Sequence, residues 1–237
     1  MILTQSVYSS LKFSAEKGQK PLAVLIDPEK FDLESTEVFL RNLKPEVSFI
    51  LVGGSTTKKI NIESLVKEIK TYTDLPVILF PGDYTQITQA ADAILFLSLI
   101  SGRNPEYLIG QQVKSVQALK DSDLEIIPTG YILIDGGKEC AVHRVSNTAP
   151  IAQKEIKKIV ETALAGQYSG QKLIYLEAGS GAIFPVSEEI ISEVKNSINI
   201  PLIVGGGIRS KTQLTLAYEA GADLVVVGTA FEKGMTI

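Results

Sequence analysis

The sequence predicts a single-domain α/β protein built as a (β/α)8 barrel, or TIM barrel, with one of its helices degenerate. Eight short apolar runs rich in Val, Ile and Leu are distributed over the 237 residues, and helical patterns separate them. The runs show little polar alternation, which is typical of parallel strands with both faces covered. An open doubly wound sheet gives the same local pattern, but eight strands in a chain of this length favour the closed barrel.

The eight predicted strands are residues 21–26, 48–52, 75–80, 93–97, 125–134, 172–176, 200–204 and 223–227. Between them, apolar residues at positions i, i+3, i+4 and i+7 predict helices with one core-facing side. Two clear stripes of this kind are Ile62, Leu65, Val66 and Ile69, and Ile156, Ile159, Val160 and Ala163. The interval 83–92 is short for a full crossover helix, so a degenerate helix is expected there.

The last strand–helix–strand unit is well marked. Ser210 and Gln213 have the spacing of a capping box, and Gly221 stands where the C-terminal cap of that helix belongs. Residues 136–153, by contrast, are long and polar, which predicts a functional loop. No tract rich in Pro, Gly and Ser divides the chain, so residues 1–237 are expected to form one domain.

The composition excludes several classes of protein. A formal charge of −4 and 45% hydrophobic residues exclude wholesale disorder and argue against nucleic-acid binding along the whole chain. One Cys and one His cannot form an internal disulfide or a His/Cys metal cluster, which leaves oxygen atoms as metal ligands. No uninterrupted apolar stretch reaches the roughly 18 residues of a transmembrane segment, and we expect a soluble, cytoplasmic protein.

Catalytic residues of such a barrel lie just after the strands, and polar or glycine-rich segments occur there. These segments are residues 27–30, 53–56, 177–181, 205–209 and 228–229. Glycines after the seventh and eighth strands let backbone N–H groups approach an anion, and the following helix N-terminus favours negative charge. Glycine runs also make plain tight turns. Because two runs follow these particular strands, a phosphate site is the better interpretation.

Three side chains in these segments are candidates for chemistry. Pro28 holds Asp27 extended toward the mouth of the barrel, where Asp27 either binds Mg²⁺ or caps the next helix. Ser55 can complete a Mg²⁺ site in which substrate phosphates supply the other oxygens. Glu177 follows an apolar strand and needs a partner, either a substrate hydroxyl or a neighbouring cation. Four further side chains are interpreted as packing or ordinary loop residues, namely Tyr131, Tyr175, Cys140 and His143.

Six strand-end motifs together resemble one known family. In chain order they are residues 27–30 (DPEK), 52–55 (VGGS), 128–131 (PTGY), 175–181 (YLEAGSG), 204–209 (VGGGIR) and 227–229 (VGT). The set resembles the geranylgeranylglyceryl phosphate synthase family, which includes the bacterial heptaprenylglyceryl phosphate synthases, and it extends over nearly the whole chain. The GGGIR and GT pair occurs in many phosphate-binding barrels, whereas LIDPEK, VGGST and YLEAGSGA in this order are specific.

The resemblance implies a Mg²⁺-dependent prenyltransferase of ether-lipid synthesis and phospholipid metabolism. Such an enzyme joins the 3-hydroxyl of sn-glycerol 1-phosphate to a long isoprenyl diphosphate, with geranylgeranyl diphosphate as the favoured donor, and releases pyrophosphate. Asp27 and Ser55 resemble its Mg²⁺ ligands, although a shift of register by one residue would place Thr56 there. The residues that resemble its glycerol 1-phosphate site are Tyr175, Leu176, Glu177, Ala178, Gly179, Ser180, Gly181, Gly206, Gly207, Gly228 and Thr229. We also expect a homo-oligomer.

Glu177 is the candidate catalytic residue, because a carboxylate near the acceptor hydroxyl can orient it and take its proton. The prenyl tail needs an apolar trough, and residues 96–100 with Tyr107 are candidates to line it. One branch of the family has a Lys two residues before the metal Asp. Leu25 stands at that position here, so the chain resembles the other branch, with its Lys at Lys30. Residues 135–148 do not match the family pattern.

Two alternative classes would share the phosphate site. A phosphosugar isomerase or aldolase on the same barrel would normally need a Lys or paired carboxylates at the strand ends, and these strand ends offer no interior Lys. A phosphate- or nucleotide-binding barrel without catalytic activity would leave Asp27 and Glu177 without a role.

Overall fold

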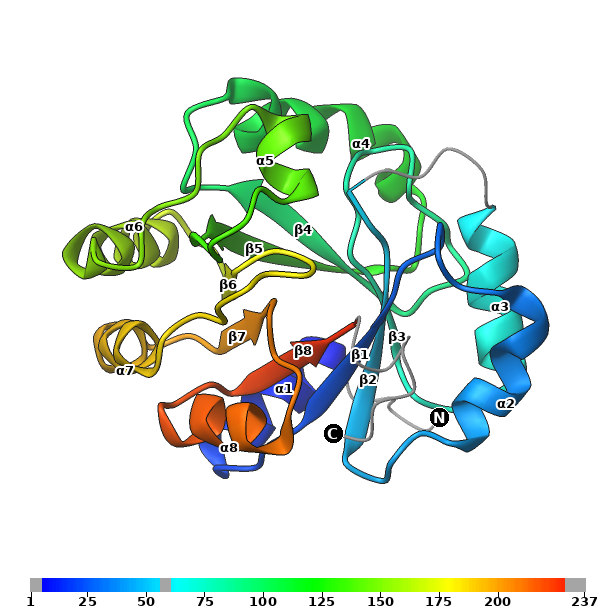
Figure 1. Cartoon of the computed structure of the whole chain (residues 1–237). Coiled ribbons are helices and arrows are strands. Elements are labelled where there is room, and N and C mark those ends of the chain that lie inside the picture. Colours follow the sequence, from blue (N-terminus) through cyan, green and yellow to red (C-terminus); the bar gives the residue numbers. More distant parts are fainter. Residues whose placement is uncertain (1–5, 56–60, 229–237) are drawn as a thin grey trace.

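Eight parallel strands form a closed barrel in the computed structural model, which describes residues 6–55 and 61–228 (Figure 1). Neighbouring strands pair in chain order, and β8 pairs with β1 to close the ring. The strands are β1 Leu22–Ile26, β2 Val47–Val52, β3 Val77–Leu79, β4 Ala93–Leu99, β5 Glu125–Leu133, β6 Leu173–Glu177, β7 Leu202–Gly205 and β8 Leu224–Val227. All eight predicted strands are present, and the predicted barrel is confirmed.

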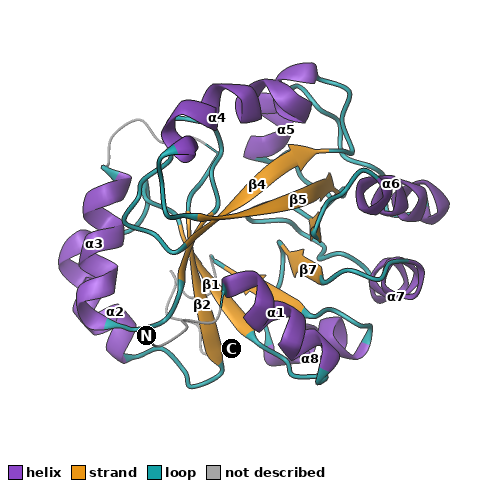
Figure 2. Ribbon diagram, turned by 180° about the vertical axis from the view of Figure 1, so that it is seen from behind, coloured by secondary structure: helices purple, strands orange, loops and turns teal. Residues whose placement is uncertain are grey.

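Helices surround the barrel on the outside (Figures 1 and 2). They are α1 Val7–Glu16, α2 Thr36–Arg41, α3 Ile62–Tyr72, α4 Gln111–Lys120, α5 Ala141–Ser146, α6 Ile156–Tyr168, α7 Glu188–Ser197 and α8 Lys211–Glu219. A 3-10 turn, η1 Leu33–Ser35, precedes α2, and a π-helical turn, η2 Glu106–Gly110, leads into α4. Within the described part of the chain, no helix combines the length and apolar character needed to cross a membrane.

The local signals in the sequence match the helices that they predicted. All four residues of the first apolar stripe are buried in α3, and in α6 two of the second stripe are buried and two partly buried. The Ser210 hydroxyl accepts a hydrogen bond from the Gln213 N–H at 3.2 Å and so caps α8, and Gly221 ends it with φ +111°. Between β3 and β4, residues 80–92 form no helix, which confirms the degenerate unit.

Two helices were not predicted. Helix α1 lies across the N-terminal end of the barrel in Figure 2, where Val7 and Leu11 join the side chains that fill the barrel interior. Helix α5 interrupts the segment 136–153 that was expected to be a loop throughout. It is only 6 residues long, so its sequence is too short for a helical periodicity to be visible.

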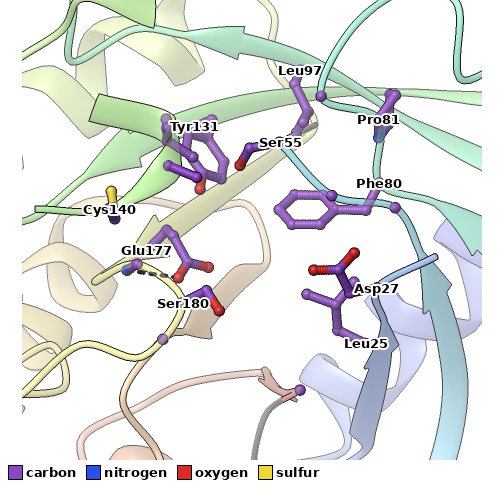
Figure 3. Close-up of a pocket in the computed structure, with 18 of the residues that line it drawn as sticks. Leu25, Asp27, Ser55, Phe80, Pro81, Leu97, Tyr131, Cys140, Glu177 and Ser180 are labelled. Atoms are coloured by element: carbon purple, nitrogen blue, oxygen red, sulfur yellow. Dashed lines mark hydrogen bonds between the residues drawn. The ribbon is translucent and has the colours of Figure 1, made fainter. Parts of the chain in front are cut away.

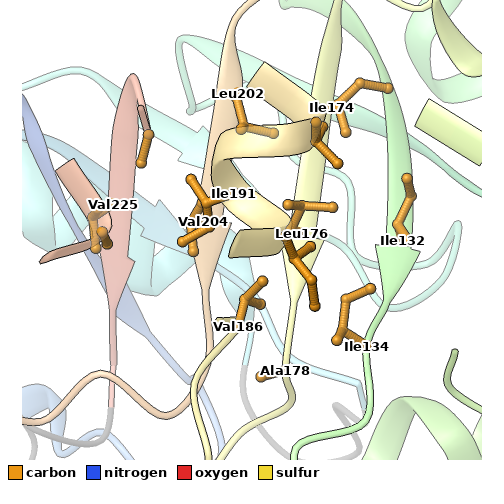
Figure 4. Close-up of a cluster of buried hydrophobic side chains, with 14 of the residues drawn as sticks. Ile132, Ile134, Ile174, Leu176, Ala178, Val186, Ile191, Leu202, Val204 and Val225 are labelled. Atoms are coloured by element: carbon orange, nitrogen blue, oxygen red, sulfur yellow. The ribbon is translucent and has the colours of Figure 1, made fainter. Parts of the chain in front are cut away.

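Side chains on each strand alternate between the barrel interior and the layer under the helices. On β6, Tyr175 belongs to the interior cluster, whereas Leu176 and Ala178 belong to the outer core beneath the helices. Figure 4 shows Leu176 and Ala178 in this outer core, close to Ile134 and Val186. Because Glu177 lies two residues after Tyr175, the alternation directs its carboxylate into the mouth of the barrel.

Candidate functional site

A cavity of about 580 Å³ opens at the end of the barrel where the strands finish (Figure 3). One end of it, the polar end, carries carboxylates and glycines. The polar end is formed by Asp27, Glu177, Gly179, Ser180, Gly181, Gly206, Gly207 and Gly228. A second part, the apolar arm, is lined by Phe80, Ile87, Ile94, Phe96, Leu97, Leu99, Tyr107, Tyr131, Val142 and Val145.

Glu177 ends β6 and is buried, with only 6% of the residue exposed. Its Oε1 accepts a hydrogen bond from the Gly179 N–H at 2.7 Å. Burial raises the pKa of Glu177 to about 6, although the Gly179 N–H and the Tyr175 hydroxyl favour the charged form and oppose the rise. Among the described residues no Lys or Arg forms an ion pair with it. The neighbouring cation, one of the two partners expected from the sequence, is therefore not supplied by the described residues.

Tyr131 and Tyr175 surround Glu177 with aromatic rings. Their ring centroids lie 5.3 Å apart, and Phe80 packs against both, at 6.0 and 5.2 Å. Burial, and next the Glu177 carboxylate, raises the pKa of both phenols well above the ordinary value, so both stay protonated. The buried Tyr175 hydroxyl makes no hydrogen bond of good geometry within the described residues, but it lies close enough to the Glu177 carboxylate to favour its charged form. Both tyrosines were predicted to pack in the core, and both do, but both also face the cavity.

Asp27 follows β1 and faces Glu177 across the polar end (Figure 3). Its Oδ1 accepts a hydrogen bond from the Glu29 N–H at 3.1 Å, and its Oδ2 lies 2.5 Å from the Lys30 ammonium. Ser55 also lines the cavity, but Figure 3 shows its hydroxyl directed toward Tyr131 and not toward Asp27. The alternative ligand, Thr56, lies outside the described residues.

The oxygen atoms at Asp27 suit a hard cation that takes most of its ligands from water and substrate and only a few from the protein. Within residues 6–55 and 61–228, no three His, Cys, Asp or Glu side chains gather closely enough to hold a metal ion by themselves. Magnesium is usually held by one or two carboxylates together with water and substrate phosphates. A single carboxylate at the mouth of a cavity fits that mode of binding, whereas the Ser55 hydroxyl would have to turn toward Asp27 to join it.

The glycine segments supply unpaired backbone donors to the polar end. In the described chain, the backbone N–H groups of Ser180, Gly181, Gly206 and Gly207 donate to no other protein group. Gly206 and Gly207 have φ +83° and +75°, which a glycine adopts without strain. Such converging N–H groups favour an anion. Thr229, expected to add a hydroxyl, lies outside the described residues.

Gly206 and Gly228 differ in the space that the fold leaves for a side chain. A Cβ on Gly206 would lie 2.4 Å from Oε1 of Glu177, so this position must be glycine for Glu177 to keep its place. A Cβ on Gly228 would lie 3.5 Å from Leu25, which is ordinary contact. Gly206 is thus required by the protein itself, whereas the fold leaves room for a small side chain at Gly228, which lines the cavity.

The sequence-predicted glycerol phosphate residues do not all reach the cavity. Leu176 and Ala178 lie in the outer core, because the alternation along β6 turns them away from the barrel interior. The other described members of that set line the cavity, namely Tyr175, Glu177, Gly179, Ser180, Gly181, Gly206, Gly207 and Gly228.

The apolar arm exists because no helix covers β3 and β4 between residues 80 and 92. Of the predicted trough, Phe96, Leu97, Leu99 and Tyr107 line it. Ile100 instead packs into the outer core beside Gly130, so closely that a Cβ on Gly130 would lie only 2.8 Å from the Ile100 Cδ1. The arm is continuous with the polar end, so one elongated molecule can occupy both.

The segment around α5 closes one side of the cavity, a role that its sequence did not reveal. Cys140 is 8% exposed, lines the cavity and packs against Gly179, so its interpretation as an ordinary loop side chain was wrong. Two hydrogen bonds fasten α5 to the β4–α4 connection. The Tyr107 hydroxyl donates to the Val145 carbonyl at 3.0 Å, and the Asn104 amide donates to the Ser146 carbonyl at 2.8 Å.

Comparisons with known proteins agree with this architecture. Residues 16–236 match the model of the PcrB family. The chain is 63% identical over 217 residues to the geranylgeranylglyceryl phosphate synthase of Zunongwangia profunda, covering 92% of this chain and 93% of that protein. It is 44% identical over 223 residues to the synthase of the same name from Thermococcus gammatolerans, covering 93% and 88% of the two chains.

A solved structure is also closely similar. It is the (S)-3-O-geranylgeranylglyceryl phosphate synthase of Thermoplasma acidophilum in complex with its substrate sn-glycerol-1-phosphate. The two chains superpose with a TM-score of 0.88 at 36% identity, covering 96% of this chain and 92% of the other. The chain therefore belongs to the PcrB family, together with these geranylgeranylglyceryl phosphate synthases, and the resemblance first indicated by its strand-end motifs is confirmed.

Proposed function

We propose that the protein is a Mg²⁺-dependent prenyltransferase that joins sn-glycerol 1-phosphate to geranylgeranyl diphosphate and releases pyrophosphate. The observation that carries the proposal is one cavity that combines an apolar arm with a buried carboxylate and with backbone N–H groups, none of which has an ion-pair or hydrogen-bonding protein partner, respectively, among the described residues. A small phosphorylated acceptor suits the polar end, and a long hydrocarbon suits the arm. The names of the relatives support both substrates, and the Thermoplasma acidophilum complex supports the acceptor.

On the acceptor side, the N–H groups of residues 180, 181, 206 and 207 hold the phosphate of glycerol 1-phosphate. Glu177 accepts a hydrogen bond from the 3-hydroxyl and takes its proton as the oxygen bonds to the first carbon of the prenyl chain. The bond between that carbon and the diphosphate oxygen breaks, and pyrophosphate leaves with the bonding electrons. Because the pKa of Glu177 is about 6, the carboxylate is ionised at neutral pH and still basic enough to accept a proton.

On the donor side, charge balance favours a metal ion. Among residues 6–55 and 61–228, five carboxylates, Asp27, Glu29, Asp83, Glu139 and Glu177, line the cavity against four cationic side chains, Lys30, Lys138, Arg144 and Arg209. Two phosphorylated substrates would add further negative charge to a lining with an excess of one carboxylate. Asp27 would hold Mg²⁺, joined by Ser55 if its hydroxyl turns toward Asp27, and the bound ion supplies positive charge at the leaving diphosphate.

An assay tests the proposal directly. Purified protein is incubated with sn-glycerol 1-phosphate, with prenyl diphosphates of increasing length and with Mg²⁺ or EDTA, and the lipid product is extracted and identified by mass. We expect the ether of glycerol 1-phosphate only with Mg²⁺, and most product from geranylgeranyl diphosphate. Absence of product with every donor would overturn the proposal, and turnover of a phosphosugar instead would favour the isomerase or aldolase class.

We expect Gly228→Ala to weaken binding of glycerol 1-phosphate about tenfold and to change binding of the prenyl diphosphate less than about twofold. The added methyl fits the fold, 3.5 Å from Leu25, but crowds the polar end where the phosphate sits. Calorimetric titration of each substrate measures the two affinities. Gly206→Ala serves as the contrast, since its Cβ collides with Glu177 and should lower both stability and rate. Equal weakening of both substrates by Gly228→Ala would contradict the assignment of the polar end to the acceptor.

We expect Tyr175→Phe to move the acidic limb of the pH–rate profile to higher pH and to leave the rate at pH 8 close to wild type. The Tyr175 hydroxyl favours the charged form of Glu177, so its removal lets burial raise the pKa of Glu177 further above 6. The hydroxyl is buried without a well-formed hydrogen bond among the described residues, so the melting temperature should be unchanged or higher. An unchanged pH profile would show that Tyr175 has no influence on Glu177.

A further inference from the structure

Both oxygens of the Asp27 carboxylate are engaged by the turn that follows β1. Oδ1 accepts the Glu29 N–H at 3.1 Å, and Oδ2 lies 2.5 Å from the Lys30 ammonium. The side chain of Asp27 is 19% exposed, whereas that of Lys30 is 52% exposed. Both side chains line the cavity, so a cation that enters it and reaches Asp27 meets a carboxylate already paired with the ammonium.

A metal ion and Lys30 thus compete for one carboxylate. Two cations on the same oxygen repel each other strongly at these distances. The lysine end of the pair is half-exposed although Asp27 is not, so water can replace the ammonium on the carboxylate and the pair opens at modest cost. Lysine is suited to such a change, because its charge is carried on a flexible four-carbon stem.

We propose that Lys30 changes partners during substrate binding: it neutralises Asp27 in the empty site and passes to the diphosphate when the metal takes its place on Asp27. This inference rests on the proposed function, since it assumes a metal and a diphosphate at this end of the cavity. The ammonium has only to turn from one anion to another within the same cavity, because Asp27 and Lys30 both line it. Lys30 would then be a positioning residue for Asp27 and a binding residue for the donor.

The exchange makes two measurable forecasts of opposite sign. Removing the Lys30 charge should tighten binding of a divalent cation to the protein alone, because its competitor is gone. The same change should weaken binding of a metal–pyrophosphate complex, because one charge-assisted contact is lost. A lysine that merely stabilises the turn would produce neither effect.

The test uses the full-length chain and three variants. Lys30→Met removes the charge and keeps the length of the side chain, and Lys30→Arg keeps the charge. Lys67→Met is the matched control, since the Lys67 ammonium also lies 2.5 Å from a carboxylate, that of Glu63, and does not line the cavity. Binding of Mn²⁺ alone is followed by paramagnetic resonance, and binding of pyrophosphate in saturating Mg²⁺ by calorimetry.

For Lys30→Met we expect Mn²⁺ to bind about threefold to tenfold more tightly and pyrophosphate about tenfold more weakly than in wild type. Lys30→Arg should keep wild-type pyrophosphate affinity, and Lys67→Met should match wild type in both measurements. If Lys30→Met binds Mn²⁺ no more tightly, or binds pyrophosphate as well as wild type, the exchange is overturned. Thermal melts show that the variants are folded, and Lys30→Gln repeats the test if the Met variant is not.

The two proposals fail in different ways. The binding measurements need no turnover, so opposite changes in the two affinities support the exchange even if no prenyl ether is formed. Product formation by the wild-type protein, together with unchanged affinities in Lys30→Met, supports the proposed function and overturns the exchange.

Discussion

The Glu177→Gln variant is expected to lose at least about a hundredfold in turnover while remaining folded. The amide has nearly the same size as the carboxylate, and its oxygen can still accept the Gly179 N–H that now binds Oε1 at 2.7 Å. It cannot take a proton from the acceptor hydroxyl. Single-turnover rates measured beside a thermal melt separate loss of chemistry from loss of structure.

The pH dependence of turnover and that of folding stability both follow from the raised pKa of Glu177. In the wild type the base is protonated as the pH falls through about 6, so kcat/KM should decline there. Because the folded-state pKa lies above the ordinary value of 4.5, Glu177 favours folding at low pH, and this advantage is lost as the pH rises through 6. At pH 8 the charged, buried group costs about 2 kcal/mol, a cost that the neutral Gln variant avoids.

The melting temperature of Glu177→Gln at pH 8 should therefore equal or exceed that of the wild type. Glu125→Gln is a matched control, because Glu125 is also a barrel-strand carboxylate that accepts a backbone N–H, that of Tyr8 at 3.2 Å, and does not line the cavity. A Glu177→Gln variant with a lower melting temperature and a wild-type rate per folded molecule would show that Glu177 serves stability and not proton transfer.

The sequence predicted the barrel well because strands covered on both faces leave continuous apolar runs. The helices with full stripes, such as α3, were equally visible. Helix α1 was missed because only Val7 and Leu11 of its 10 residues are buried, which is too few for a periodic signal. The short interval before Asp92 did predict that no full helix lies between β3 and β4. The sequence did not predict that the missing helix opens the apolar arm. This depends on the packing of β4 against α4, which no local sequence pattern contains.

The candidate site also has features that the sequence could predict and features that it could not. The strand-end positions of Asp27 and Glu177 placed both carboxylates at one mouth, since the ends of parallel strands meet there. The alternation along β6 was also available in the sequence, and it would have separated Leu176 and Ala178 from their cavity-facing neighbours. The contact of Cys140 with Gly179 could not be predicted from the sequence, because it depends on the path of a long connection over the barrel.

The Asp27→Asn variant is expected to lose at least about a hundredfold in Mg²⁺-dependent turnover, since a metal at the leaving group contributes several kcal/mol of transition-state stabilisation. The two roles considered for Asp27 make different forecasts here. Asn keeps the oxygen that accepts the Glu29 N–H at 3.1 Å, so a mere cap would tolerate the change. A metal ligand would not, because the amide carries no negative charge.

Asp32→Asn provides the comparison that separates these roles. The Asp32 carboxylate accepts the Glu34 N–H at the same distance of 3.1 Å, begins the turn η1 and does not line the cavity. If both variants melt like the wild type and only Asp27→Asn loses turnover and Mn²⁺ binding, Asp27 acts through its charge at the metal. If Asp27→Asn is as active as Asp32→Asn, the Asp27 carboxylate is a turn cap, and the metal must be held by the substrate phosphates and other oxygens of the polar end.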